Sequence, residues 1–94
     1  MSFFEDFVPG QSACSRSLDV SQDDIVAFAS RYDAQDFHVD PEAAKTSFVG
    51  RLIGSGWHSC ALLMRLMAED FLLDAASMGA PGIEEVKWLR PLLP

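Results

Sequence analysis

The sequence has 94 residues, which make one domain at most and would complete a sizeable core only with difficulty, and with 49% hydrophobic and 22% charged residues it is too apolar for a disordered chain. The net charge of -7 comes from 14 acidic against 7 basic residues, and the scattered bases argue against a nucleic-acid surface. The two cysteines, Cys14 and Cys60, do not make a disulfide framework, and we expect a cytoplasmic location.

The N-terminal stretch MSFFEDFVPG carries Glu5 and Asp6 and lacks a basic region, so we expect part of the mature chain rather than a signal peptide. The longest uncharged run through the main apolar segment, Leu52 to Met64, is too short to span a bilayer. No membrane partner is expected.

The first regular elements are a weak strand and a helix. Residues Ser15 to Val20 alternate loosely, which predicts a strand. Ser21 is followed three residues later by Asp24, the spacing of a capping box, and apolar residues then recur at helical intervals. This pattern predicts a helix over 22–31.

A polar loop is expected over 33–40. The pair Asp40-Pro41 is typical of an N-cap followed by proline at the first helical position, and it predicts a short helix through Lys45. A helix on each side would hold the loop stiff.

The glycine turn Gly54-Ser55-Gly56 opens the longest apolar segment, which predicts a helix from Ser55 to about Ser77. Its apolar residues occupy most of the circumference, so we expect burial on more than one side. At ~1.5 Å per residue this helix would be about 30 Å long.

The segment Gly79 to Gly82 breaks this helix, and Ile83 to Leu89 is predicted to form a strand. A long apolar helix with two strands cannot cover itself. We therefore expect residues 1–94 to be the N-terminal part of one larger domain, truncated after its first strands.

Two features suggest chemistry. Asp33 and His38 could divide the proton transfers needed to add or remove water next to a carbonyl, as positioned acids and bases do. The same spacing also fits a turn-capping aspartate and a structural histidine. The glycine turn before a helix could direct backbone N–H groups at a developing oxyanion, or could be a tight turn capped by Ser55.

A metal site is disfavoured. Asp36, His38 and Asp40 alternate like ligands of a hard metal, but Pro41 and Ser47 occupy positions where a calcium loop requires glycine and glutamate. We expect no metal and no redox cofactor.

Several blocks of the chain, in order and spacing, resemble the MaoC-like dehydratase family, which includes the (R)-specific enoyl-CoA hydratases. These blocks are FFEDFVPGQ, DDIVAFASRYDAQDFHVDPEAA, GRLIGSGWHSCALLMRLM and EEVKWLRPLLP. One departure is Gln35-Asp36, where the hydratase signature usually has Asn-Pro.

The resemblance implies an α+β hot-dog fold, an antiparallel sheet wrapped around one long helix, arranged as a homodimer or as paired domains. It implies catalysis by Asp33 and His38 on acyl-CoA thioesters, with the N–H of Gly56 polarising the thioester carbonyl. Substrate contacts are expected from neighbouring residues of both segments, namely Gln35, Phe37, Gly54, Ser55 and Trp57.

The expected function is that of a lyase that adds water to a trans-2-enoyl thioester or removes it from a 3-hydroxyacyl thioester. The alternative is a non-catalytic hot-dog module that binds an acyl chain or a partner, and a metal-dependent hydrolase is a weaker third possibility. The bases that could contact coenzyme A phosphates are Lys45, Arg51, Arg65, Lys87 and Arg90.

Overall fold

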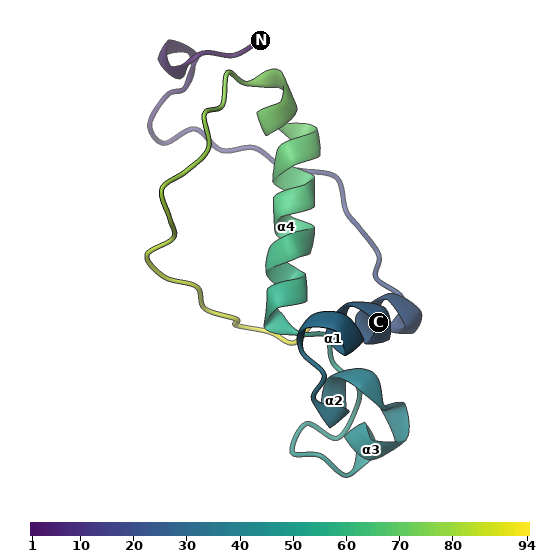
Figure 1. Cartoon of the computed structure of the whole chain (residues 1–94). Coiled ribbons are helices and arrows are strands. Elements are labelled where there is room, and N and C mark those ends of the chain that lie inside the picture. Colours follow the sequence, from purple (N-terminus) through teal and green to yellow (C-terminus); the bar gives the residue numbers. More distant parts are fainter.

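The structure, a computed structural model, describes all residues 1–94. One long helix, α4, stands on a base of three shorter helices, and extended segments run along both of its sides (Figure 1). The elements in chain order are the 3-10 turn η1 (Phe4–Asp6), α1 (Gln22–Tyr32), α2 (Asp36–Val39), α3 (Pro41–Lys45), α4 (Gly56–Asp70) and the 3-10 turn η2 (Leu72–Asp74).

Helix α1 confirms the prediction over 22–31 and is one residue longer. Its N-terminus is a full capping box: the Asp24 N–H donates to the Ser21 hydroxyl at 3.1 Å, and the Ser21 N–H donates to the Asp24 carboxylate at 3.4 Å. These bonds satisfy two of the N–H groups that a helix start leaves unpaired. Asp33 caps the C-terminus, where its N–H donates to the carbonyl of Ala29 at 2.7 Å.

The expected loop over 33–40 contains one helical turn, α2, which turns His38 inward. Asp40 both ends α2 and starts α3, because its N–H donates to the carbonyl of Asp36 while its carboxylate accepts from the N–H groups of Glu42 and Ala43. Proline at the first position of α3 leaves no donor unpaired there. The predicted short helix from Pro41 through Lys45 is confirmed.

A small apolar core lies between α1, α3 and the segment that leads to α4. It consists of Ile25, Ala44 and Leu52, with Val20, Val26 and Phe37 packed against it. Ile25 is completely buried, and burial of such a side chain stabilises the fold by about 1.5–3 kcal/mol. This core fixes the positions of the helices that carry the polar residues described below.

Helix α4 begins where the glycine turn predicts, with the Ser55 hydroxyl accepting from the N–H of Trp57 at 3.2 Å. Its predicted end near Ser77 is wrong, because the α-helix ends at Asp70 and only the short turn η2 follows. The last turn holds Glu69 and Asp70 and no basic residue, and negative charges are unfavourable at the negative end of a helix dipole.

The expectation that α4 is buried on more than one side is also wrong for this chain. His58 is its only buried residue, whereas Leu63, Met64 and Met67 are 58%, 49% and 40% exposed. The radius of gyration of 16.4 Å exceeds the value of about 12 Å typical of a compact domain of this length, so residues 1–94 do not enclose the helix. No helix has both the length and the apolar character required to cross a bilayer.

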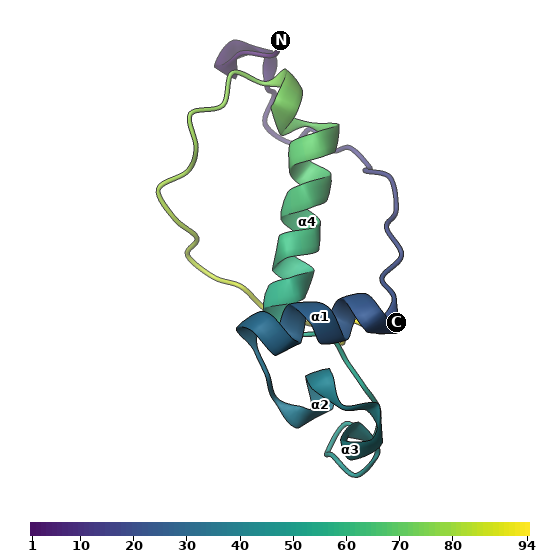
Figure 2. The same cartoon turned by 45° about the vertical axis from the view of Figure 1, so that its right-hand side comes forward.

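The strands predicted over Ser15 to Val20 and Ile83 to Leu89 are absent, and both segments are extended without a ladder (Figure 2). Only two isolated bridges form, Ser2 with Ala75 in parallel and Gly54 with Leu92 in antiparallel orientation. An extended segment becomes a strand only when a neighbour pairs with its N–H and C=O groups, and here the two segments lie on opposite sides of α4. The expected antiparallel sheet is therefore not formed within these residues.

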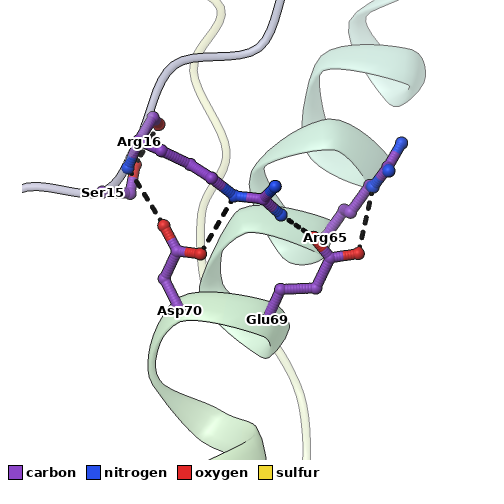
Figure 3. A network of polar contacts seen from close by, with 5 residues as sticks. All are labelled: Ser15, Arg16, Arg65, Glu69 and Asp70. Atoms are coloured by element: carbon purple, nitrogen blue, oxygen red, sulfur yellow. Dashed lines mark hydrogen bonds and ion pairs between the residues drawn. The ribbon is translucent and has the colours of Figure 1, made fainter.

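Arg16 ties the N-terminal extended segment to the end of α4 (Figure 3). Its N–H and its Nε donate to the Asp70 carboxylate at 3.0 and 3.1 Å, and its guanidinium also pairs with Glu69. Arg65 completes the network from the preceding turn of α4, with its Nε 3.1 Å from Glu69. Because Arg16 is half exposed, each pair contributes at most about 1 kcal/mol.

Candidate active site

The carboxylate of Asp33 lies where the C-terminus of α1 meets the N-terminus of α4. Oδ1 accepts a hydrogen bond from Gln35 Nε2 at 2.7 Å, and Oδ2 accepts one from Ser55 Oγ at 2.7 Å. The hydrogen bond from Gln35, then that from Ser55, hold the pKa of Asp33 below its usual value of 3.8, and the charge of His38 acts in the same direction. Partial burial opposes this shift. Asp33 is therefore an ionised acceptor.

His38 is only 5% exposed, and the helical turn α2 directs its ring at Asp33. Its Nδ1 lies 2.7 Å from the carbonyl oxygen of Ile53, which can only accept, so Nδ1 carries the proton. The other ring nitrogen, Nε2, lies 3.4 Å from Asp33 Oδ2. Nε2 is consequently the atom that can take up or release a proton beside the carboxylate.

Ser55 joins the two helices. Its side chain is completely buried, donates to Asp33 and accepts from the N–H of Trp57. Both roles of the hydroxyl are used within the chain. Ser55 thus supports Asp33 in the structure, and its predicted contact with substrate stays a prediction.

Gly56 is the first residue of α4, and its N–H donates to no acceptor in the chain. Trp88 covers its Cα: the indole Nε1 donates to the Gly56 carbonyl at 2.8 Å, and any Cβ at this position would collide with the indole ring. Gly54 is equally confined, because a Cβ there would lie 2.6 Å from Leu92. Only glycine fits at either position while the segment 88–92 keeps its place.

His38 and Gly56 line one pocket of about 260 Å³. The remaining lining residues come from the turn before α4, its first turn and the C-terminal segment, and they are Ile53, Gly54, Ser59, Trp88, Arg90, Pro91 and Leu92. The pocket therefore brings an imidazole together with a helix N-terminus whose first N–H is free, an arrangement suited to a carbonyl oxygen or to an anionic group.

The other predicted contact residues lie outside this pocket. Gln35 binds Asp33 and is exposed, and Phe37 packs edge-on against the His38 ring at a centroid distance of 4.4 Å. Trp57 is 60% exposed and contacts Trp88 at 5.3 Å. Of the five predicted contacts only Gly54 lines the pocket. Phe37 and Trp57 pack against lining residues, whereas Gln35 and Ser55 donate to Asp33.

Sequence reasoning missed the contributions of Trp88 and Leu92. These residues were assigned to a strand and its end, and their contacts with Gly56 and Gly54 span 32 and 38 positions of the chain. The block EEVKWLRPLLP was a usable clue, because the family resemblance rests in part on it. No group of three or more histidine, cysteine or acidic side chains is arranged to hold a metal ion.

Comparison with known proteins identifies the family. The sequence model described as MaoC like domain matches residues 6–94. The uncharacterized protein YdeM of Bacillus subtilis (strain 168) is 30% identical over 90 residues, which are 96% of this chain and 64% of that protein. The crystal structure of the MaoC-like dehydratase from Rhodospirillum rubrum superposes with a TM-score of 0.78 at 38% identity, over 98% of this chain and 62% of that chain.

This chain thus spans less than two thirds of the length of each of these relatives. The family match nevertheless includes Asp33 and every segment that lines the pocket, from the turn with His38 to the C-terminal segment. The chain belongs to the MaoC-like dehydratase family.

Proposed function

We propose that the protein is an acyl-CoA hydratase or dehydratase, which interconverts a trans-2-enoyl thioester and its 3-hydroxyacyl thioester. The observation that carries this proposal is that His38, whose Nε2 lies 3.4 Å from Asp33 Oδ2, lines the same pocket as Gly56, whose N–H is free. Family membership supports the same reaction class.

In this proposal the thioester carbonyl accepts the N–H of Gly56, so that negative charge developing on its oxygen meets the positive end of α4. Removal of one such donor costs about 10²- to 10³-fold in rate in enzymes that depend on it. The Trp88 indole donates to the Gly56 carbonyl and covers the Gly56 Cα, so it packs against the first residue of α4.

Asp33 and His38 handle the protons. For hydration, one water molecule hydrogen-bonds to both the carboxylate and Nε2, its oxygen forms a bond to the β-carbon, and one of its protons passes to the pair. The pair returns a proton to the α-carbon as the enolate collapses, so the elements of water are added without net change in the enzyme. Ser55 and Gln35 keep Asp33 ionised for this role.

The complete enzyme, in this proposal, covers α4 with an antiparallel hot-dog sheet and acts as a homodimer or paired domain in the cytoplasm. Three observations support it: the exposed apolar face of α4, the shorter span of this chain than of its relatives, and the absence of a disulfide. Burial of that face would supply the apolar contacts that residues 1–94 lack.

The test is loss of enoyl-thioester absorbance when crotonyl-CoA is mixed with the full-length protein. Asp33→Asn and His38→Gln should each lower turnover by about 10²- to 10⁴-fold, the range for positioned acid and base groups. Asp36→Asn is the matched control, because this neighbouring acid makes no side-chain contact with the pair. Near wild-type turnover in both variants would refute the assignment.

A non-catalytic acyl-binding module is the second candidate, and the open surface of α4 favours it. The two candidates are separated by the same mixing experiment combined with calorimetry. Binding of the enoyl thioester with no change in its absorbance, in wild type as well as in the variants, would establish the module.

A further inference from the structure

His58 is the second of the two histidines and has no place in the chemistry proposed above. It lies in the first turn of α4, and it is only 7% exposed. Its ring stacks face to face on Phe28 of α1, with centroids 4.5 Å apart and planes inclined by 8°. This stack links the two helices whose ends meet at the site.

The ring of His58 makes no hydrogen bond. Its Nδ1 is fully buried without a partner, and Nε2 has no partner either. A buried charge without a partner is strongly unfavourable, so the packed ring is neutral. Burial accordingly lowers the pKa of His58 below 6.5, and the charge of Asp24 only partly opposes this.

The stack lies close to the catalytic contact on both helices. Ser55 precedes His58 by three residues on α4, and the His58 N–H donates to the Ser55 carbonyl at 3.0 Å. On α1, Phe28 also contacts Tyr32 at 5.1 Å, and Tyr32 is followed directly by Asp33. The stack therefore connects the segment that carries Ser55 to the helix end that carries Asp33.

We propose that neutral His58 is a positioning residue, which holds Ser55 within hydrogen-bonding distance of Asp33, and that protonation of His58 separates the two. The imidazole thus makes the hydroxyl-to-carboxylate contact sensitive to acid, although it touches neither the pocket nor the reacting atoms.

A cavity beside the His58 ring can accommodate the ring in its protonated form. It measures about 250 Å³, and its charged lining groups are Asp19, Asp24 and Arg65. Asp24 is already engaged at the N-terminus of α1, and Arg65 pairs with Glu69. The net charge of the three groups is negative, so it attracts a charged imidazole away from Phe28 and into the cavity.

The first test needs no substrate. In the full-length protein, the Asp33 carboxyl carbon is followed by NMR between pH 8 and pH 4.5, together with both histidine rings. In the wild type, the Asp33 signal should shift in step with the titration of the His58 ring. In His58→Phe, which keeps an aromatic stack that cannot be protonated, this part of the shift should be absent.

His58→Ala completes the set, because it removes the stack at every pH. Its Asp33 signal should already be displaced at pH 8. The inference is overturned if the Asp33 signal in His58→Ala equals the wild-type signal at pH 8, or if wild type and His58→Phe respond identically to pH.

The second test rests on the proposed function and uses the pH profile of turnover. His58→Ala should lower kcat by about tenfold to a hundredfold with little change in KM, as expected when a catalytic group is misplaced by a fraction of an ångström to 1 Å. The kcat of His58→Phe should be higher than that of His58→Ala at all pH values. It should also fall less than the kcat of the wild type as the pH is lowered. A profile of His58→Phe that parallels the wild type would contradict the inference.

A failure of the proposed function can be distinguished from a failure of the role proposed for His58. If the wild type turns over no enoyl thioester, the proposed function fails, while the NMR titration still decides whether His58 controls the contact between Ser55 and Asp33. If turnover is present and the titrations are unaffected by the substitutions, only the role of His58 fails.

Discussion

Ser55 Oγ donates a 2.7 Å hydrogen bond to Asp33 Oδ2 across 22 positions of the sequence, and the same hydroxyl caps α4. One side chain therefore fixes the start of the longest helix and the orientation of the candidate catalytic carboxylate. The stability of α4 and the ionisation of Asp33 are consequently linked through a single oxygen atom.

Ser55→Ala should remove both contacts at once. We expect a loss of about 1–3 kcal/mol in the free energy of unfolding, because a helix cap disappears and a partly buried carboxylate oxygen loses its donor. Urea denaturation measures this change. Ser47→Ala is the control: its hydroxyl donates to the Ala44 carbonyl, away from the site, and an equal loss there would show that Ser55 has no special role.

The acid sensitivity of the fold should depend on Asp33. Its pKa is lower in the folded protein than the usual 3.8, so the folded state binds fewer protons than the unfolded chain in that range. The resulting stabilisation is fully present above pH 3.8 and is lost as pH falls through the folded-state pKa. Asp33→Asn should therefore flatten the dependence of the unfolding free energy on pH below about 4.

Urea denaturation of wild type and Asp33→Asn at a series of pH values measures this difference. Asp36→Asn serves as the control, because this acid has no side-chain hydrogen bond. If the unfolding free energies of wild type and Asp33→Asn change in parallel below pH 3.8, the hydrogen bonds from Gln35 and Ser55 do not lower the pKa of the Asp33 carboxyl in solution.

Gly56→Ala should displace Trp88, because the new methyl group would occupy the space of the indole ring. We expect a change in tryptophan fluorescence and a loss of about 1–3 kcal/mol, the range for overpacking a filled site. Gly82→Ala is the matched control, since a Cβ there meets nothing within 4 Å. An unchanged emission spectrum in Gly56→Ala would place Trp88 elsewhere in solution.

Ile25→Ala should be the most damaging apolar substitution among residues 1–94. Ile25 is completely buried in the core under the site, and such truncations cost about 2–5 kcal/mol. Ile83→Ala removes the same atoms from a side chain that is 79% exposed. In thermal unfolding, the midpoint of Ile25→Ala should lie clearly below that of Ile83→Ala. Similar midpoints would contradict the assignment of a core between α1, α3 and Leu52.

The local part of this structure could be predicted because its causes are local. Ser21 with Asp24, Asp40 with Pro41, and Ser55 before an apolar run each specify a helix start through bonds within three residues, and all three starts are confirmed. The end of α4 was misplaced because apolar periodicity continues after Asp70, whereas the acidic last turn opposes further helix.

The parts that depend on distant pairing could not be predicted. The extended segments 15–20 and 83–89 have strand-like composition, but a ladder requires a neighbouring strand, which composition does not supply. The contact of Trp88 with Gly56 joins residues 32 apart and follows from no spacing rule. The catalytic roles of Asp33, His38 and Gly56 stay predictions, whereas their proximity is a property of the structure.

No flexible linker separates α2 from α3, because the single residue Asp40 ends the first helix and starts the second. The turn that carries His38 and the helix that contributes Ala44 to the core are therefore rigidly connected. A tilt of α3, such as one caused by a subunit that binds its outer face, would also change the orientation of the His38 imidazole.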